Sequence, residues 1–475
     1  MATKTAQRKE RLLVGGEWVD SESTLPVTDL ADGGHFAEVV AASPEQAEDA
    51  LASAHAMKET LRETTLVERA EWMLEIADKL EAREEELAEV IVREAGKPIS
   101  SARGEVGSAA ERFRRAAEEI RHIKGQFREG TTAGHEGWEA IVKHEPVGTV
   151  LCITPYNYPL ATTALQVAPA LAAGNSVVLK PATKTPVSGA ILAEVVNEVV
   201  PDGTLNFVTG KGSEIGDILA GDDRINAVAM TGSSGAGKHV AKESGMVNLH
   251  MELGGNAPAV VFPDADLDEA AAAAAKGSLK YAGQRCSAVS RVLAHEDIHD
   301  ELVETIEEKM GDWVKGDLFD EDTDLGPLIS EDQAEWVEGL VQDALDKGAT
   351  LVTGGERDGR DFEPTLLADV PHDARIVHEE QFGPVCAVTK VADEDEAVAL
   401  ANEGDLALDA AVFTADYDRA MKLANVIDAG AVRINGAPSH GLGDIPFGGN
   451  KDSGIGREGL DASIHAFLRK KSIVL

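Results

Sequence analysis

The chain has 475 residues, a length that predicts two or three domains rather than one small core. Its 84 acidic and 44 basic residues give a formal net charge of −40, which argues against nucleic acid and anionic membranes as partners. The three cysteines are too few for a disulfide framework, and their spacing predicts no metal site. With 43% hydrophobic and 27% charged residues, the composition is that of a soluble globular protein.

Nothing in the sequence predicts a membrane span or a secretion signal. The most apolar stretch, residues 160–179, is interrupted by Gln166, Pro169, Gly174 and Asn175. The first residues are basic but lack an apolar core and a cleavage site. We therefore expect a cytoplasmic protein in a reducing compartment. The acidic surplus suits a protein kept soluble in high salt, so we hypothesise a halophilic source, with an ordinary acidic enzyme as the alternative.

The periodicity of apolar residues predicts helices first over about 64–95 and 105–124. From residue 147 on, four short apolar runs are each followed by a helical pattern; they are "VGTVLCI", "SVVLK", "TLNFV" and "INAVAMT". This alternation predicts a parallel sheet covered on both faces, with ligands at the carboxyl ends of its strands.

After "MELGGNAP" the alternation starts again and predicts a second α/β domain. It contains helices near 264–282, 297–311 and 331–347, and strands near 287–294, 384–391, 409–414 and 430–435. Two segments lie outside both patterns. They are residues 125–145, approximately, and the C-terminal sequence "KKSIVL". An apolar strand at a chain end has an unpaired edge, so we expect it to pair with another segment or subunit.

Cys286 is a candidate nucleophile in the loop "YAGQRCSAVSR". A free cysteine is more often a buried apolar residue, and Cys152 and Cys386, inside apolar strands, fit that interpretation. Cys286 instead lies in a polar loop, where Arg285 would favour the thiolate and Gly283 would permit a tight turn.

Three further motifs place candidate residues at or after the ends of predicted strands. Glu252 in "MELGGN" offers a carboxylate at a strand end, although such an acid is usually only solvated. Gly232 and Ser233 in "MTGSSGAGK" open a helix whose N-terminus could bind phosphate, although the spacing is not that of a known nucleotide fingerprint. Lys180 ends "SVVLK" and could equally be a surface lysine.

In combination these motifs resemble the NAD(P)-dependent aldehyde dehydrogenase superfamily. The matching segments, in the family's order and spacing, are "PYNYP", "LKPA", "TGS", "MELGGN", "GQRC", "EEQFGP" and "PFGGNKDSGIGRE". The resemblance covers nearly the whole chain. It implies an α/β fold with three parts. A Rossmann-type cofactor domain spans residues 1–124 and 146–253, and an α/β catalytic domain spans residues 254–445. A small β oligomerisation element spans residues 125–145 and 460–475.

The resemblance also implies a mechanism. Cys286, as thiolate, would attack the aldehyde carbon to form a thiohemiacetal. The Asn157 side-chain amide and the Cys286 backbone N–H would hold its oxyanion. Hydride transfer to the nicotinamide would leave a thioester, which water activated by Glu252 would hydrolyse to the carboxylic acid. An acylating enzyme that uses coenzyme A, or a catalytically silent protein, is the alternative, and the presence of Glu252 argues for hydrolysis.

Cofactor roles carry over in the same way. Lys180 resembles the ribose-binding lysine, the "TGS" turn with Gly232 and Ser233 the pyrophosphate contact, and Glu380 the acceptor for the nicotinamide ribose. Phe382 would border the nicotinamide, and Glu458 resembles an acid implicated in proton exit. Many relatives that prefer NAD have a glutamate where this chain has Thr183. With Lys180 and Lys184 nearby, we therefore expect NADP, or use of both cofactors.

The substrate motifs are most similar to the branch containing non-phosphorylating glyceraldehyde-3-phosphate dehydrogenase and archaeal lactaldehyde dehydrogenase. Arg285 and Tyr158 match residues that grip a substrate phosphate in that branch, but Ser108 and His440 stand where further arginines are expected. This favours a small polar or singly charged aldehyde, such as lactaldehyde or glyceraldehyde. Glyceraldehyde 3-phosphate, succinate semialdehyde and 2-oxoglutarate semialdehyde are the alternatives, and a homodimer or homotetramer is expected.

Overall fold

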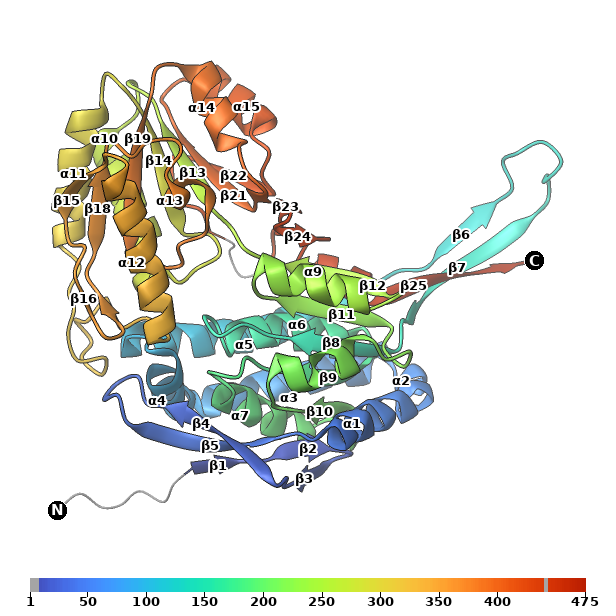
Figure 1. Cartoon of the computed structure of the whole chain (residues 1–475). Helices are drawn as coiled ribbons and strands as arrows, with labels where there is room; N and C mark the ends of the chain where they lie inside the picture. Colours follow the sequence, from blue (N-terminus) through green and yellow to red (C-terminus); the bar gives the residue numbers. More distant parts are fainter. Residues whose placement is uncertain (1–7, 440–442) are drawn as a thin grey trace, which may run out of the picture.

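The computed structural model describes residues 8–439 and 443–475. Two α/β parts lie next to each other, and a narrow three-stranded arm projects from one of them (Figure 1). The first part holds most of the chain up to β12, and the second holds the strands from β13 to β22. The α/β class and the predicted layout of two α/β parts with a small β element are confirmed.

The first part is built on an eight-stranded sheet. Its order is β24 (Gly454–Ile455), β12 (Asn248–Glu252), β11 (Ala227–Thr231), β8 (Thr149–Ile153), β9 (Ser176–Lys180), β10 (Leu205–Phe207), β2 (Leu12–Val14) and β3 (Glu17–Val19). The five central strands are parallel, as the four apolar runs predicted, and β24 and β2 pair antiparallel at the two sides.

The strand order reverses between β8 and β11. From β8 the chain continues to β9 and β10 on one side, then returns to place β11 and β12 on the other. In parallel sheets, the loops that leave the carboxyl ends at such a point diverge and leave a crevice. The loops in question carry Asn157 after β8 and Gly232 after β11.

Helices cover both faces of this sheet because its strands are apolar on both sides. Val150 and Cys152 of β8 pack in a cluster with α3 (Leu66–Ala82), α4 (Glu84–Ala95), α5 (Ile99–Ile120), α6 (Ala161–Ala172) and α7 (Val187–Asn197). Leu151, between them in sequence, packs on the opposite face with α1 (Pro44–Ala56) and α8 (Asp217–Ala220). This alternation is the two-residue period of a strand.

Two predicted helix boundaries were wrong. The helix expected over 64–95 is interrupted at Arg83, whose φ of −110° and ψ of 21° separate α3 from α4. The helix expected from residue 105 begins at Ile99, directly after Pro98, since proline ends an extended segment and suits a helix start.

The second part has a seven-stranded sheet. Its order is β15 (Thr350–Thr353), β18 (Thr365–Ala368), β19 (Val385–Val391), β14 (Val289–His295), β13 (Ala257–Val261), β21 (Asp409–Phe413) and β22 (Ala431–Ile434). All neighbours pair in parallel except β15 with β18. Its main helices are α10 (Leu267–Leu279), α11 (His299–Gly311), α12 (Glu331–Asp346), α14 (Glu394–Ala401) and α15 (Tyr417–Val426).

The arm is a three-stranded antiparallel sheet that brings distant segments together. β7 (Glu139–Pro146) lies between β6 (Gln126–Glu129) and the C-terminal β25 (Leu468–Val474). Its exposed apolar side chains are Phe127, Trp138, Ile141, Ile473 and Val474. The terminal strand therefore pairs with another segment, as predicted. The domain boundaries themselves stay predictions.

The remaining elements are short or peripheral. They are β1 (Arg8–Glu10), β4 (Ser23–Thr28), β5 (His35–Ala41), α2 (Lys58–Glu63), the π-helical turn η1 (Gly212–Gly216), α9 (Ser234–Glu243), η2 (Lys280–Gly283), β16 (Arg357–Asp358), β17 (Asp361–Phe362), α13 (Arg375–His378), β20 (Leu406–Ala407), β23 (Asn450–Lys451) and α16 (Leu460–Ala466). Among the described residues, none of the helices is both long and apolar enough to cross a membrane.

Candidate active site

A cavity of about 1120 Å³ lies between the two α/β parts. That volume exceeds what one small molecule needs, so the cavity can hold a dinucleotide and a small substrate together. It brings together nearly all of the residues singled out from the sequence: Asn157, Tyr158, Lys180, Thr183, Gly232, Ser233, Glu252, Arg285, Cys286, Glu380, Phe382 and Glu458. His440 lies outside the described residues.

The loop before Cys286 has an unusual backbone. Tyr281 and Ala282 have φ values of 56° and 49°, and Gly283 follows at 69°. Non-glycine residues in this left-handed region cost about 1–3 kcal/mol each and persist only where the surroundings hold them. The Tyr281 hydroxyl donates to the Ala95 carbonyl at 2.7 Å, which ties the loop to the end of α4. A Cβ on Gly283 would lie 2.0 Å from the Gly383 carbonyl oxygen, so only glycine fits there.

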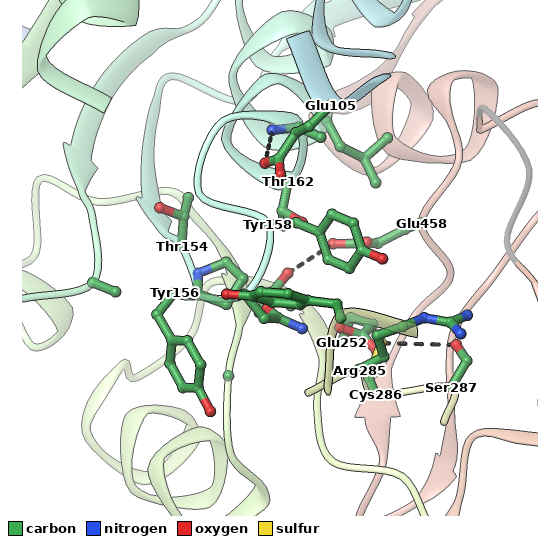
Figure 2. Close-up of a pocket in the computed structure, with 18 of the residues that line it drawn as sticks. Glu105, Thr154, Tyr156, Tyr158, Thr162, Glu252, Arg285, Cys286, Ser287 and Glu458 are labelled. Carbon is green, nitrogen blue, oxygen red and sulfur yellow. Dashed lines mark hydrogen bonds between the residues drawn. The ribbon is translucent and has the colours of Figure 1, made fainter. Parts of the chain in front are cut away.

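The thiol of Cys286 is half-buried and faces the cavity. Its Sγ lies 3.8 Å from the Ser287 hydroxyl (Figure 2). Burial, and then the neighbouring Glu252 carboxylate, raise the pKa of the thiol well above its usual value. We expected Arg285 to favour the thiolate and so to lower the pKa of the thiol, but the net effect of the surroundings is to raise it. The Arg285 Nη2 donates to the Pro438 carbonyl at 3.4 Å.

Glu252 stands at the last position of β12 and is 2% exposed. Its Oε1 has no hydrogen-bond partner within the described part of the chain. Burial, followed by the charge of Glu458, raises the pKa of Glu252 well above its usual value, and a hydrogen bond with Cys286 acts in the opposite direction. Figure 2 shows Glu252, Arg285 and Cys286 grouped on one side of the cavity. The carboxyl group is therefore placed to exchange a proton with the thiol or with a water molecule beside it.

The amide of Asn157 is held in place from the cysteine loop. Its Nδ2 donates to the Gln284 carbonyl at 3.0 Å, and the side chain is 5% exposed. An amide nitrogen has two hydrogens, so the second can serve a substrate oxygen. Gln284 is fixed in turn, because its Oε1 accepts from the Ile329 backbone N–H at 2.9 Å. Sequence reasoning missed Gln284, although it lies inside the "GQRC" motif.

A buried ion pair fixes the loop that carries Asn157. Lys97 pairs with Glu105, whose Oε1 accepts from the backbone N–H groups of Leu160 and Ala161 at 3.0 and 3.1 Å. The Lys97 Nζ lies 3.6 Å from the ring centre of Tyr158, and burial lowers the pKa of this lysine to about 8. Neither charge was predicted. The one available signal was Glu105 in the apolar stripe of its helix, where a carboxylate needs a partner.

The two glycines of "MELGGN" allow a close approach to the site. A Cβ on Gly255 would lie 2.1 Å from the Cys286 carbonyl oxygen, and one on Gly254 would lie 2.9 Å from Glu380 Oε2. The Gly255 N–H donates to Glu380 Oε1 at 2.8 Å. Burial raises the pKa of Glu380 to about 7. The glycines thus bring the nucleophile loop and a buried carboxylate to one point.

The opposite end of the cavity has features that suit a dinucleotide. Lys180 is 7% exposed, its Nζ contacts only the Pro181 carbonyl at 3.4 Å among the described residues, and burial lowers its pKa to about 8. Ser233 caps α9 by accepting from the Ala236 N–H at 3.3 Å. Thr183 donates to the Gly210 carbonyl at 3.3 Å. A buried lysine without a carboxylate partner and a helix N-terminus fit sugar hydroxyls and phosphate.

Comparison with known proteins gives the family. The model of the "Aldehyde dehydrogenase family" matches residues 18–473. The chain belongs to the aldehyde dehydrogenase family. The enzyme class predicted from the sequence is thereby confirmed.

Individual relatives of this aldehyde dehydrogenase agree with the predicted branch. An NADP-dependent glyceraldehyde-3-phosphate dehydrogenase from Streptococcus equinus is 39% identical over 464 residues, 97% of each chain. A lactaldehyde dehydrogenase from Methanocaldococcus jannaschii is 34% identical and covers 98% of this chain and all of the relative. The crystal structure of NADP-dependent glyceraldehyde-3-phosphate dehydrogenase from Bacillus halodurans C-125, complexed with NADP, matches with a TM-score of 0.97, at 37% identity and 99% coverage of both chains.

Proposed function

We propose that this aldehyde dehydrogenase oxidises a small polar or singly charged aldehyde to its carboxylic acid, with Cys286 as the nucleophile. The observation that carries the proposal is that Cys286, Glu252 and Asn157 line the same cavity, with Asn157 bonded to the cysteine loop at the Gln284 carbonyl. They come from the loop before β14, the end of β12 and the loop after β8. A thiol, a base and an amide donor are the set that thioester chemistry requires.

The first step is attack of Cys286 on the aldehyde carbon. Since burial and Glu252 favour the neutral thiol, its proton has to leave as the bond forms, and the Glu252 carboxylate, which is hydrogen-bonded to the thiol, would accept it. The carbonyl oxygen becomes an alkoxide, which the second Asn157 N–H and the Cys286 backbone N–H stabilise. NAD(P)⁺, when bound, would supply the acceptor for the hydride of the resulting thiohemiacetal. After Glu252 has released the proton that it took from the thiol, it would take a proton from water, which attacks the thioester and frees Cys286.

Glu458 would carry the proton away from Glu252. Its charge raises the pKa of Glu252, and burial raises its own pKa to about 7. The Thr231 hydroxyl donates to Glu458 Oε1 at 3.4 Å. A carboxyl with a pKa near neutrality can both accept and release a proton at the working pH.

The cofactor would be held between the two α/β parts, and NADP is the preferred one. Lys180 would bind a ribose, the turn at Gly232 and Ser233 the pyrophosphate, and Glu380 the nicotinamide ribose, with Phe382 beside the ring. Thr183 is neutral and Lys184 is exposed, so no carboxylate at this position repels a 2′-phosphate. The NADP-dependent relatives support this choice.

The aldehyde would lie against Tyr158 and Arg285, with lactaldehyde and glyceraldehyde as the first candidates. A second candidate activity is non-phosphorylating glyceraldehyde-3-phosphate oxidation, because the relative from Streptococcus equinus has that name and Arg285 faces the cavity. Ser108 lines the same cavity where an arginine was expected. A dianionic phosphate would therefore lose charge-assisted hydrogen bonds worth about 1.5–3 kcal/mol each.

Substitution of the nucleophile tests this proposal. Cys286→Ala should abolish NADP reduction by every aldehyde, while the affinity for NADP in the absence of substrate stays within about twofold. Turnover retained in Cys286→Ala would refute the role of the thiol. A panel with lactaldehyde, glyceraldehyde, glyceraldehyde 3-phosphate, succinate semialdehyde and 2-oxoglutarate semialdehyde, each with both cofactors, then ranks the substrates.

We also propose that the arm joins subunits and that the acidic surface requires salt. Strands β6 and β25 form the two edges of the arm, and the apolar residues listed above are exposed on it. A dimer or tetramer would cover them. At a net charge of −40, self-repulsion should destabilise the fold in dilute buffer and be screened in molar salt. Sedimentation and denaturation measured across salt concentrations test both proposals.

A further inference from the structure

Arg112 is a charged residue of the cavity that no motif singled out. It lies on α5 and lines the cavity together with Arg285 and Tyr158. Its Nε and Nη1 are buried and have no hydrogen-bond partner within residues 8–439 and 443–475. A guanidinium cannot lose its charge at physiological pH, and burying one without compensation costs several kcal/mol. Arg112 therefore lines the cavity as a cation with hydrogen-bond donors that the described residues leave unsatisfied.

The acids around Arg112 do not satisfy those two nitrogens. Glu105 is engaged by Lys97 and by the N-terminus of α6. Glu458 is close enough to interact electrostatically with Arg112, but its described side-chain hydrogen bond comes from Thr231. An anion that entered the cavity would therefore meet an available guanidinium at Arg112.

The place of Arg112 on α5 connects it with the substrate position. Ser108 and Arg112 are four residues apart, so they lie on the same face of the helix, about 6 Å apart along its axis. Both line the cavity. The arginine expected at position 108 is absent, and one stands a single helical turn further along the same face. Arg285 lies in the cysteine loop, which is distant from α5 in the sequence. Its side chain makes a weak hydrogen bond to the Pro438 carbonyl.

We propose that Arg112, together with Arg285, binds the anionic end of the aldehyde substrate, a carboxylate or a phosphate, and so selects charged aldehydes over neutral ones of the same length. This inference rests on the proposed function and revises its ranking of substrates, because it places charged aldehydes ahead of the neutral lactaldehyde and glyceraldehyde. The oxygens of such a group would accept from the Arg112 guanidinium where it lines the cavity, and their charge would pair with a cation that a neutral chain end leaves unpaired. The shifted position of the arginine also places the anion one turn away from where an arginine at 108 would hold it.

The experiment compares matched aldehydes with the full-length enzyme at one fixed salt concentration. The pairs are succinate semialdehyde with butanal, and glyceraldehyde 3-phosphate with glyceraldehyde. In Arg112→Met, which keeps the length but loses the charge and the donors, the ratio of kcat/KM for the charged to the neutral member should fall about 10- to 100-fold. The loss should appear mainly in KM. Arg112→Lys should recover part of the ratio, and the pair with the larger fall identifies carboxylate or phosphate.

Arg115→Met is the matched control. Arg115 lies on the same helix and donates to Glu111 at 3.0 Å outside the cavity lining, so its loss removes the same charge without touching the site. It should leave every ratio unchanged. A ratio unaffected in both Arg112 variants, or equal losses for charged and neutral members, would overturn the inference. So would a wild-type enzyme that prefers neutral aldehydes, although aldehyde oxidation itself would then stand. Absence of turnover with any aldehyde would instead overturn the proposed function.

Discussion

Replacing Asn157 by alanine separates an effect on catalysis from an effect on stability. The structure gives the amide two tasks, since one Nδ2 hydrogen binds the Gln284 carbonyl at 3.0 Å and the other is left for the oxyanion. Loss of an oxyanion donor typically lowers kcat by about 10²- to 10³-fold. Loss of the bond to Gln284 leaves a buried carbonyl unsatisfied and should cost about 1–3 kcal/mol of unfolding free energy. The catalytic effect should therefore greatly exceed what the lost stability alone explains.

The assay is the rate of the first NADPH turnover, followed by rapid mixing of enzyme with cofactor and aldehyde. Asn157→Ala should slow this step by about 10²- to 10³-fold, with little change in NADP affinity. Asn157→Asp keeps the size but removes the donor, so it should be at least as slow. Denaturant titration of the same proteins measures the loss of unfolding free energy. A first turnover within about threefold of the wild-type rate would refute the assignment of Asn157 as the oxyanion donor.

Three further predictions concern the cofactor and the nucleophile loop. Thr183→Glu should lower the preference for NADP over NAD by about 10- to 100-fold, because a carboxylate repels the 2′-phosphate; an unchanged preference in steady-state kinetics would exclude this contact. Gly283→Ala should cost about 2–4 kcal/mol in urea denaturation, because its Cβ would lie 2.0 Å from the Gly383 carbonyl; a fully stable variant would show that the loop is not so constrained. NADP affinity should be greatest between pH about 7 and about 8, because Glu380 accepts most strongly when it is ionised, above its raised pKa of about 7, and Lys180 carries a charge only below its lowered pKa of about 8. Fluorescence titration of NADP binding checks this, and affinity that fell continuously from acid to alkaline pH would rule out Glu380 as an acceptor.

The strands and helices of the first sheet could be predicted because their signals are local. Continuous apolar runs such as "SVVLK" are typical of strands buried on both faces, and the segments between them have helical periodicity. The interruption at Arg83 could not be predicted, because no glycine or proline marks it and the apolar pattern continues through it. The start of α5 was also missed, because Ser100, Ser101 and Gly104 are poor helix formers that tertiary packing overrides.

For the site too, local signals could be predicted from the sequence and tertiary ones could not. Motifs located Cys286, Glu252 and Lys180, because each stands at a strand end or in a polar loop. The charges of Arg112 and Glu105 were missed, because their meaning depends on partners that are distant in sequence. The rise in the pKa of Cys286 was missed for a similar reason. Arg285 is adjacent in sequence, but burial and Glu252, which are tertiary features, dominate.

The most direct test of aldehyde oxidation at Cys286 is the mass of the enzyme after one turnover in the Glu252→Gln variant. With NADP⁺ and substrate, this variant should form NADPH slowly, because the thiol has also lost its proton acceptor. It should release at most about one NADPH per active site and then stop, because hydrolysis lacks its base. Peptide mapping should place an acyl group on Cys286, and the Cys286→Ala variant should carry none. Continuous turnover by Glu252→Gln, or an acyl group on any other residue, would contradict the proposed chemistry.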